Sequence, residues 1–132
     1  MSLDLNATMD AIGARLLTIT GLRVFDFTTN SITPPAAVVG LPEVTYDNTK
    51  ARGVDRAVFP VHVLVSKVSD KAARDKLSTY VAGTGAASVK AAIDGTLGGT
   101  VQHARVATAT TSYMTVGSVD YLAVTFQVEV YQ

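Results

Sequence analysis

Apolar and polar residues follow two different periods in this chain, and the change of period marks the predicted elements. Near the N-terminus, apolar residues recur at three- and four-residue spacings, which is typical of an amphipathic helix. From Val119 to Gln132 they recur at every second residue, which predicts a half-buried strand. The sequence therefore predicts a protein with both helices and strands. The predicted helical stripe consists of Leu5, Met9, Ile12, Leu16 and Ile19.

Capping residues place the beginnings of three helices. Ser2 or Asp4 can cap the first helix, because short polar side chains bond the unpaired amides of a first turn. Asp70 is expected to cap a second helix that runs to about Ala82, and Ser88 a short third helix. Each predicted helix is followed by a glycine that suits its end, namely Gly21, Gly83 and Gly95 in turn.

Branched and aromatic residues predict five strands, over residues 22–27, 36–41, 54–68, 101–116 and 119–132. Prolines flank the strand at 36–41, which favours an edge position because proline cannot donate to a sheet ladder. Pro60 indicates an edge or a bulge in the strand at 54–68. Residues 42–53 read as a long polar loop, and the last two strands form a hairpin around Gly117 and Ser118.

This order of elements predicts one α+β domain over residues 1–132. We expect a mainly antiparallel four- to five-stranded sheet with the helices packed on one face. Only 17% of the residues are charged, against about 25% in ordinary soluble domains. This deficit suggests that part of the surface is covered in an oligomer.

Charge and composition restrict the possible functions. The 11 Lys and Arg residues balance the 11 Asp and Glu residues, which argues against electrostatic capture of nucleic acid or an anionic membrane. The chain has no cysteine, so disulfides and thiolate chemistry are excluded. Its N-terminus lacks the basic region of a signal peptide, and no apolar run approaches the ~20 residues of a membrane span.

The sequence contains no recognisable catalytic or cofactor motif. His62 and His103 stand alone in predicted strands, whereas a zinc site needs three or four convergent ligands. The glycine-rich pieces lack the lysine and hydroxyl residue of a phosphate loop, and no nucleophile elbow is present. We therefore expect structural histidines and no metal site.

One mixed-charge segment is a candidate docking element. Lys50, Arg52, Asp55 and Arg56 lie close together in the predicted loop and at the start of the next strand, and Tyr46 precedes them. These charges can form a solvated, salt-bridged loop. They can also orient a neighbouring subunit, with Tyr46 as an aromatic anchor.

Several strings in the second part of the chain resemble one family. The order PPAAVVGLPEVTYD, RGVDR, VHVLV, SDKAARDKLSTYVAGTGAASVKAAIDG and VDYLAVTFQVEVY resembles tail terminator proteins of long-tailed phages that infect actinobacteria. The resemblance extends from about Pro34 to the C-terminus, and no string in it is a catalytic signature. It implies a small α+β virion protein that caps the head-proximal end of the tail tube and stops its polymerisation.

The resemblance also implies partners and a location. Tail terminators act as a hexameric ring between the tail tube protein and the head–tail connector or head-closure protein, and genome DNA passes through the ring. They have no enzymatic activity and no cofactor, and they are found in the neck region of the virion after assembly in the host cytoplasm. Two alternatives stay open: a tail-completion, head-closure or tail-tube protein on a similar fold, and a small ligand-binding domain.

Overall fold

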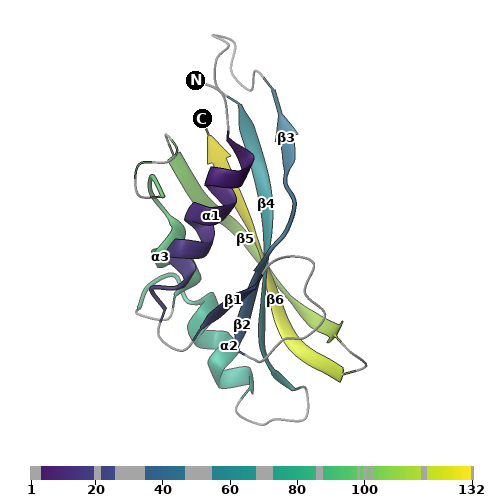
Figure 1. The fold of residues 1–132 in the computed structure, drawn as a ribbon. Helices are drawn as coiled ribbons and strands as arrows, with labels where there is room; N and C mark the ends of the chain where they lie inside the picture. Colours follow the sequence, from purple (N-terminus) through teal and green to yellow (C-terminus); the bar gives the residue numbers. More distant parts are fainter. Residues whose placement is uncertain are drawn as a thin grey trace.

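The structure is a computed structural model that describes residues 4–19, 22–25, 35–46, 55–67, 73–85, 88–97, 99, 101, 103–116 and 119–131. Within these residues, helices and strands occur in separate runs, with one helix, four strands, two helices and two strands in turn, as in an α+β chain (Figure 1). The elements are α1 (Leu5–Leu16), β1 (Arg23–Phe25), β2 (Ala36–Val39), β3 (Glu43–Thr45), β4 (Arg56–Lys67), α2 (Ala73–Val81), α3 (Val89–Ile93), β5 (His103–Val116) and β6 (Val119–Tyr131).

The strands form one open sheet of six strands rather than the four or five that we expected. Its order is β1-β2-β4-β6-β5, and β3 pairs with β4 beyond the end of β2. The β1–β2 pair is parallel and the other pairs are antiparallel, so the sheet is mixed. The predicted hairpin is confirmed, because β5 and β6 pair from His103 opposite Tyr131 to Val116 opposite Val119.

The helices pack on one face of the sheet, as predicted (Figure 1). Ile12 and Leu16 of α1, Leu77 of α2 and Ile93 of α3 join one core with the residues of β4 and β6 that face them. The alternation predicted for the last strand is confirmed, because its even-numbered residues from Val124 to Val130 are all buried in this core. We call this side the helix face and the opposite side the open face.

Two predicted helix caps are confirmed. The Asp4 carboxylate accepts a hydrogen bond from the Ala7 N–H at 3.0 Å, and the Ser88 hydroxyl accepts one from the Ala91 N–H at 3.1 Å. Each bond satisfies an amide that has no partner inside its own helix. The predicted cap Asp70 and the predicted helix end Gly21 lie outside the described residues.

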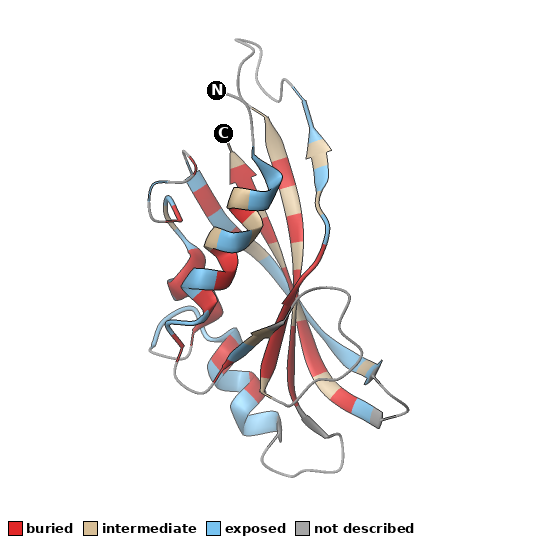
Figure 2. Ribbon diagram, viewed as in Figure 1, coloured by how far each residue is buried: buried red, intermediate tan, exposed pale blue. Residues whose placement is uncertain are grey.

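The predicted edge position of residues 36–41 is wrong. β2 lies between β1 and β4, and all four of its residues are buried (Figure 2). Pro35 and Pro42 lie just outside β2, so neither takes a donor from its ladder, and the Pro35 carbonyl accepts a hydrogen bond from the Arg23 N–H. The apolar run is therefore an interior strand, covered on both sides by strand neighbours.

The predicted polar loop at 42–53 begins with a strand instead. β3 continues the path of β2 along β4, with Glu43 opposite Val58 and Thr45 opposite Arg56. From Val39 to Glu43 the chain advances four residues while β4 advances three, from Val61 to Val58. One extra residue at this point makes a bulge between β2 and β3.

Pro60 predicted an edge or a bulge, and the structure has the bulge: β4 is an interior strand, and Pro60 lies opposite the extra residue between β2 and β3. The Pro60 carbonyl accepts a hydrogen bond from the Gly40 N–H at 2.7 Å, so the backbone of residue 60 faces the β2–β3 side. The N–H that proline lacks would point to the same side, where the bulge interrupts the ladder. A Cβ on Gly40 would lie 2.7 Å from the Pro60 ring, so this close approach requires glycine.

Candidate functional site

The first part of β5 has its outer backbone groups satisfied by α3 and the turn that follows it. Ala104 and Gly95 exchange two backbone hydrogen bonds, of 2.9 and 2.6 Å. The Val106 N–H donates to the Asp94 carboxylate at 2.9 Å, and its carbonyl accepts from the Lys90 ammonium at 3.3 Å. Gly95 adopts a φ of 132°, which favours glycine at this turn. We call residues 103–106 the capped half of β5.

The second part of β5, residues 108–115, has no such cover within the described part of the chain, and we call it the open half (Figure 2). All of its residues except the half-buried Met114 are exposed. Hydrogen-bonded and non-bonded pairs alternate along an antiparallel ladder. Ala104 bonds to Gly95, so its backbone groups point away from β6. Followed along the register with β6, the alternation makes the amides of Ala109, Thr111 and Tyr113 point away from β6 as well.

The open half also lacks the usual protection of an edge strand. No charged residue occurs between Arg105 and Asp120 in the sequence. Natural edge strands are commonly blunted by lysine, proline, bulges or a covering loop, because a bare edge is a template for another strand. Here the single bulge, at Ala107, lies where the capped half ends. The open half is thus a long, uncharged and β-prone edge.

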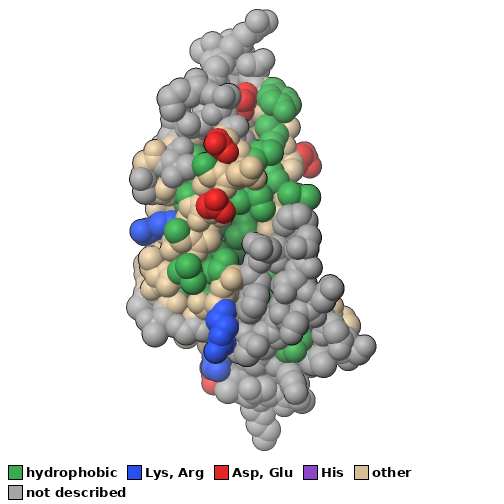
Figure 3. Space-filling view, in the orientation of Figure 1, with side chains coloured by type: hydrophobic (Ala, Val, Ile, Leu, Met, Phe, Trp, Pro, Cys, Tyr) green, Lys and Arg blue, Asp and Glu red, His purple; other side chains and the backbone are tan. Residues whose placement is uncertain are grey.

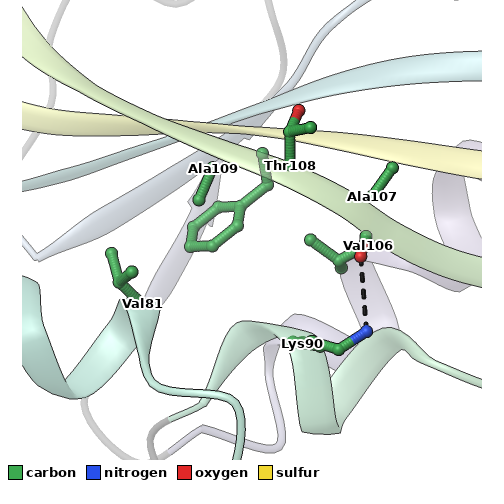
Figure 4. A pocket seen from close by; sticks show the side chains of 7 residues that line it. Val81, Lys90, Val106, Ala107, Thr108 and Ala109 are labelled. Carbon is green, nitrogen blue, oxygen red and sulfur yellow. Dashed lines mark hydrogen bonds between the residues drawn. The ribbon is translucent and has the colours of Figure 1, made fainter.

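A shallow cavity lies where the two halves of β5 meet (Figure 4). Its volume is about 100 Å³, and it opens on the helix face. Val81 at the end of α2 and Phe126 of β6 form apolar walls, and Lys90 reaches across to the Val106 carbonyl. The remaining lining comes from Val106, Ala107, Thr108 and Ala109.

Three charged side chains meet on the open face near the capped half. The Glu129 carboxylate accepts hydrogen bonds from Arg56 at 2.5 Å and from Arg105 at 3.0 Å. The hydrogen bond from Arg56, and then that from Arg105, lowers the pKa of Glu129 below its ordinary value. The Glu129 carboxylate in turn raises the pKa of Arg56. Tyr131 donates a hydrogen bond to the same carboxylate at 3.3 Å.

The predicted docking residues are only partly placed by the structure. Tyr46 is 74% exposed and follows β3 directly, at the end of the sheet where β4 begins at Arg56, one residue after Asp55. Arg56 bonds within its own chain, to Glu129, and Asp55 is half-buried. Lys50 and Arg52 lie outside the described residues. Their role in an interface stays a prediction.

The sequence analysis did not identify Glu129 as the partner of Arg56, or Arg105 as the second arginine that bonds Glu129. The alternation of the last strand had placed Glu129 on the polar face, and it is the one acidic residue there between Tyr121 and Tyr131. A single carboxylate on an otherwise uncharged strand face indicates that a basic residue lies on a neighbouring strand. The capping of β5 by Asp94 and Gly95 had no comparable signal, because it depends on how the turn after α3 folds back.

Each predicted strand histidine lies on the open face with a neighbour. The His62 imidazole lies 2.9 Å from the Thr125 hydroxyl, and burial lowers its pKa. The His103 ring stacks on Tyr131, with ring centroids 6.3 Å apart. Within the described residues, no three His, Asp or Glu side chains gather as metal ligands would.

Comparison with known proteins adds no family: no family model matches the sequence, and no match was found among curated proteins. None of the helices in the described ranges is both long and apolar enough to cross a membrane.

Proposed function

We propose that this protein is a structural virion subunit that caps the head-proximal end of a phage tail tube as a hexameric ring. The observation that carries the proposal is the open half of β5, an exposed edge with outward backbone groups and no charge. An edge of this kind invites another strand, so a protein that acted as a monomer would be expected to blunt it. An assembly subunit can leave it open for a neighbouring copy.

A second free edge on the other side of the sheet supports a ring. β3 pairs only with β4 among the described strands, and β5 pairs only with β6 along the sheet path. The two edges are different surfaces on opposite sides of one subunit. Contacts between different surfaces are head-to-tail, and they produce a ring when the rotation between copies closes.

Exposed apolar residues and the sequence resemblance add further support. Tyr46 and Leu41 are 74% and 62% exposed beside β3, and hydrophobic side chains gather between α1 and β3 in Figure 3. Both residues belong to the string that resembles tail terminators. Under this proposal the tail tube protein and the connector or head-closure protein bind the two faces of the ring, and DNA passes through it without a chemical reaction.

The alternative of a small ligand-binding domain has less support. Binding sites for small molecules usually have volumes of roughly 300–1,000 Å³. The cavity beside Lys90 has about 100 Å³, which suits a single side chain better than a metabolite. A tail-tube or tail-completion role would use the same edges, and assembly behaviour distinguishes it.

The test is the mass and shape of the assembled particle. We expect light scattering to give six copies per particle, for the protein alone or bound to tail tubes of the same phage. Electron microscopy should then show one cap at one end of each tube. Extended tubes of this protein alone would instead indicate a tube protein, and a monomer under both conditions would contradict the proposal.

A charge placed on the open half gives a matched mutational test. Thr111 is exposed, so Thr111→Lys should leave the subunit folded but block strand addition, as lysine does on natural edges. Ala14 is exposed on α1, and Ala14→Lys is the control that should leave the particle mass unchanged. If Thr111→Lys assembled like the unmodified protein, the open half would have no part in assembly.

A further inference from the structure

Strand direction indicates which edges can meet in a head-to-tail contact. β3 is antiparallel to β4, β4 to β6, and β6 to β5, so β3 and β5 run in opposite directions. A rotation about an axis that runs roughly along the strands places one copy beside the next and keeps the direction of each strand. β3 of one copy would therefore lie antiparallel to β5 of its neighbour, and the helix faces of both copies would lie on the same side.

The backbone groups of β3 fit the same contact. Residue 60 faces the β2–β3 side, and by alternation residue 58 does too, so Glu43 bonds inward to Val58. The N–H and carbonyl of Val44 then point away from β4, outward from the edge of the sheet. They are the groups that an added strand would bond, as are those of Ala109 in the open half of β5.

We infer that β3 of one copy pairs with the open half of β5 of the next, with Val44 opposite Ala109 and Thr45 opposite Thr108, and that Tyr46 fills the cavity beside Lys90. This inference rests on the proposed function, because it specifies the contact within the ring. It goes beyond that function in naming the register and the anchor. The capped half is excluded as the partner, since Gly95 already occupies its backbone groups.

Side-chain directions agree with this register. Val44 is opposite Ala57 and Ala109 is opposite Phe126, and both of those neighbours belong to the core on the helix face. Thr45 and Thr108 are opposite Arg56 and Gln127, on the open face. Residues opposite each other in a sheet share a face, so both proposed pairs match.

Tyr46 suits the cavity by chemistry and position. In the proposed register it lies opposite Ala107, which lines the cavity at the β5 bulge. Its ring would contact the Val81 side chain, and the Lys90 ammonium at the rim suits an aromatic face. Tyrosine is also the kind of residue that dominates protein interfaces, because it buries a large rigid area.

The offset between copies is compatible with a closed ring. Within one subunit Val44 is level with Ala104, through Ala57 and Val130. Pairing with Ala109 instead shifts the next copy by five residues on β5, one of which is the extra residue of the bulge. The remaining shift is four residues over the four strands β3, β4, β6 and β5, which is one residue of register shift per strand. Closed barrels with one residue of shift per strand have strands tilted by about 36° from the barrel axis.

Paired cysteines test the register directly, because the chain has no cysteine of its own. Thr45→Cys and Thr108→Cys in one chain should link neighbouring copies under mild oxidation and give a ladder of covalent multimers. The two positions within one chain are separated by three strand spacings, about 14 Å, which exceeds the reach of a disulfide. Thr45→Cys with Ser112→Cys is the control, and we expect no ladder from it.

The outcomes separate this inference from the proposed function. A hexameric particle without the Thr45–Thr108 link would overturn the register and leave the ring standing. Rapid covalent dimers from Thr108→Cys alone would mean that two copies meet through β5, and would also overturn it. A monomer under all conditions, including with tubes, would overturn the ring and the inference together.

The anchor has its own test. Tyr46→Ala should weaken ring formation about 30-fold, the effect of removing a strong interface residue. Leu17 is 61% exposed at the C-terminal end of α1, and Leu17→Ala should change ring formation less than twofold. Equal effects of the two variants on particle mass across a dilution series would contradict the role of Tyr46.

Discussion

The two halves of β5 differ in how their outer backbone groups are satisfied. In the capped half, Gly95, Asp94 and Lys90 supply partners to Ala104 and Val106. In the open half, the described chain supplies none. The outer backbone groups of one strand are therefore satisfied at one end and have no partner within the described chain at the other. The difference teaches that this fold can cover an edge strand with the turn after α3, and that this cover stops at the bulge of β5 within the described chain.

Packing separates the two halves most strongly. Val106 is buried in the core under the helices, whereas Thr110 is exposed. Val106→Ala should lower the free energy of unfolding by about 2 kcal/mol, from lost burial and a residual cavity. Thr110→Ala should change it by less than about 0.5 kcal/mol. Urea denaturation of both variants measures the contrast, and similar losses would show that the open half is packed in the monomer.

Removal of one cap tests the backbone side of the comparison. Asp94→Ala leaves the Val106 N–H without its acceptor and removes the partner of Lys90. We expect a loss of about 1–2 kcal/mol in unfolding free energy, because a satisfied amide becomes unsatisfied. Hydrogen exchange at the Val106 amide should accelerate.

The matched variant is Asp120→Ala, whose carboxylate accepts from the Thr115 hydroxyl at the open end. Its unfolding free energy should stay within about 0.5 kcal/mol of the original. In the unmodified monomer, the amide of Thr111 should already exchange much faster than that of Val106. Equal protection at the two amides would contradict the distinction between the halves.

Among the changes in and beside the capped half, substitution in the cluster of Glu129, Arg56 and Arg105 should lower the free energy of unfolding least. Glu129→Gln should cost about 1 kcal/mol at neutral pH, since both arginine contacts are partly exposed. The pKa of Glu129 is lowered in the folded protein, from an ordinary value of 4.5, mainly by the hydrogen bond from Arg56. Its contribution is therefore complete above about pH 4.5 and disappears as the pH falls through the lowered pKa.

Thermal unfolding as a function of pH measures this contribution. The two proteins should differ at pH 7 and converge in acid, below the lowered pKa of Glu129. Glu43→Gln is the control, because Glu43 is exposed and has no ion-pair partner within the described chain. A constant difference between Glu129→Gln and the original at every pH would show that charge pairing is not its cause.

Local patterns predicted the regular elements of this protein well. The alternation of β6, the hairpin with β5 and the caps Asp4 and Ser88 depend on neighbours in sequence, so they could be found without a structure. The same holds for the α+β class and for helices on one face. These features follow from period and capping alone.

The errors concern contacts between distant segments. The prolines around β2 indicated an edge, yet β2 is an interior strand. Pro60 left an edge and a bulge open, and only the pairing of β2 and β3 with β4 shows that it lies opposite a bulge. Residues 43–45 looked like loop because three residues are too few to show a period. Sheet order and bulges depend on pairing across the chain, which a single sequence does not display.

The docking residues show the same division. Tyr46 was identified from its position in a polar segment, and it is largely exposed. Arg56 was identified from the charges beside it in sequence, but its partner Glu129 comes from the other end of the chain. A charge next to others in sequence therefore says little about the charge that it meets in space.

The close contact between Gly40 and Pro60 also restricts which substitutions the two positions can accept during evolution. A larger residue at position 40 would collide with the proline ring, and a residue other than proline at position 60 would bring back an N–H that faces the bulge. The two positions should therefore change together, or not at all, as the gene diverges. The contact between Gly40 and Pro60 prevents β3 from shifting its register along β4. It thereby fixes the position of the Tyr46 ring along the edge of the sheet.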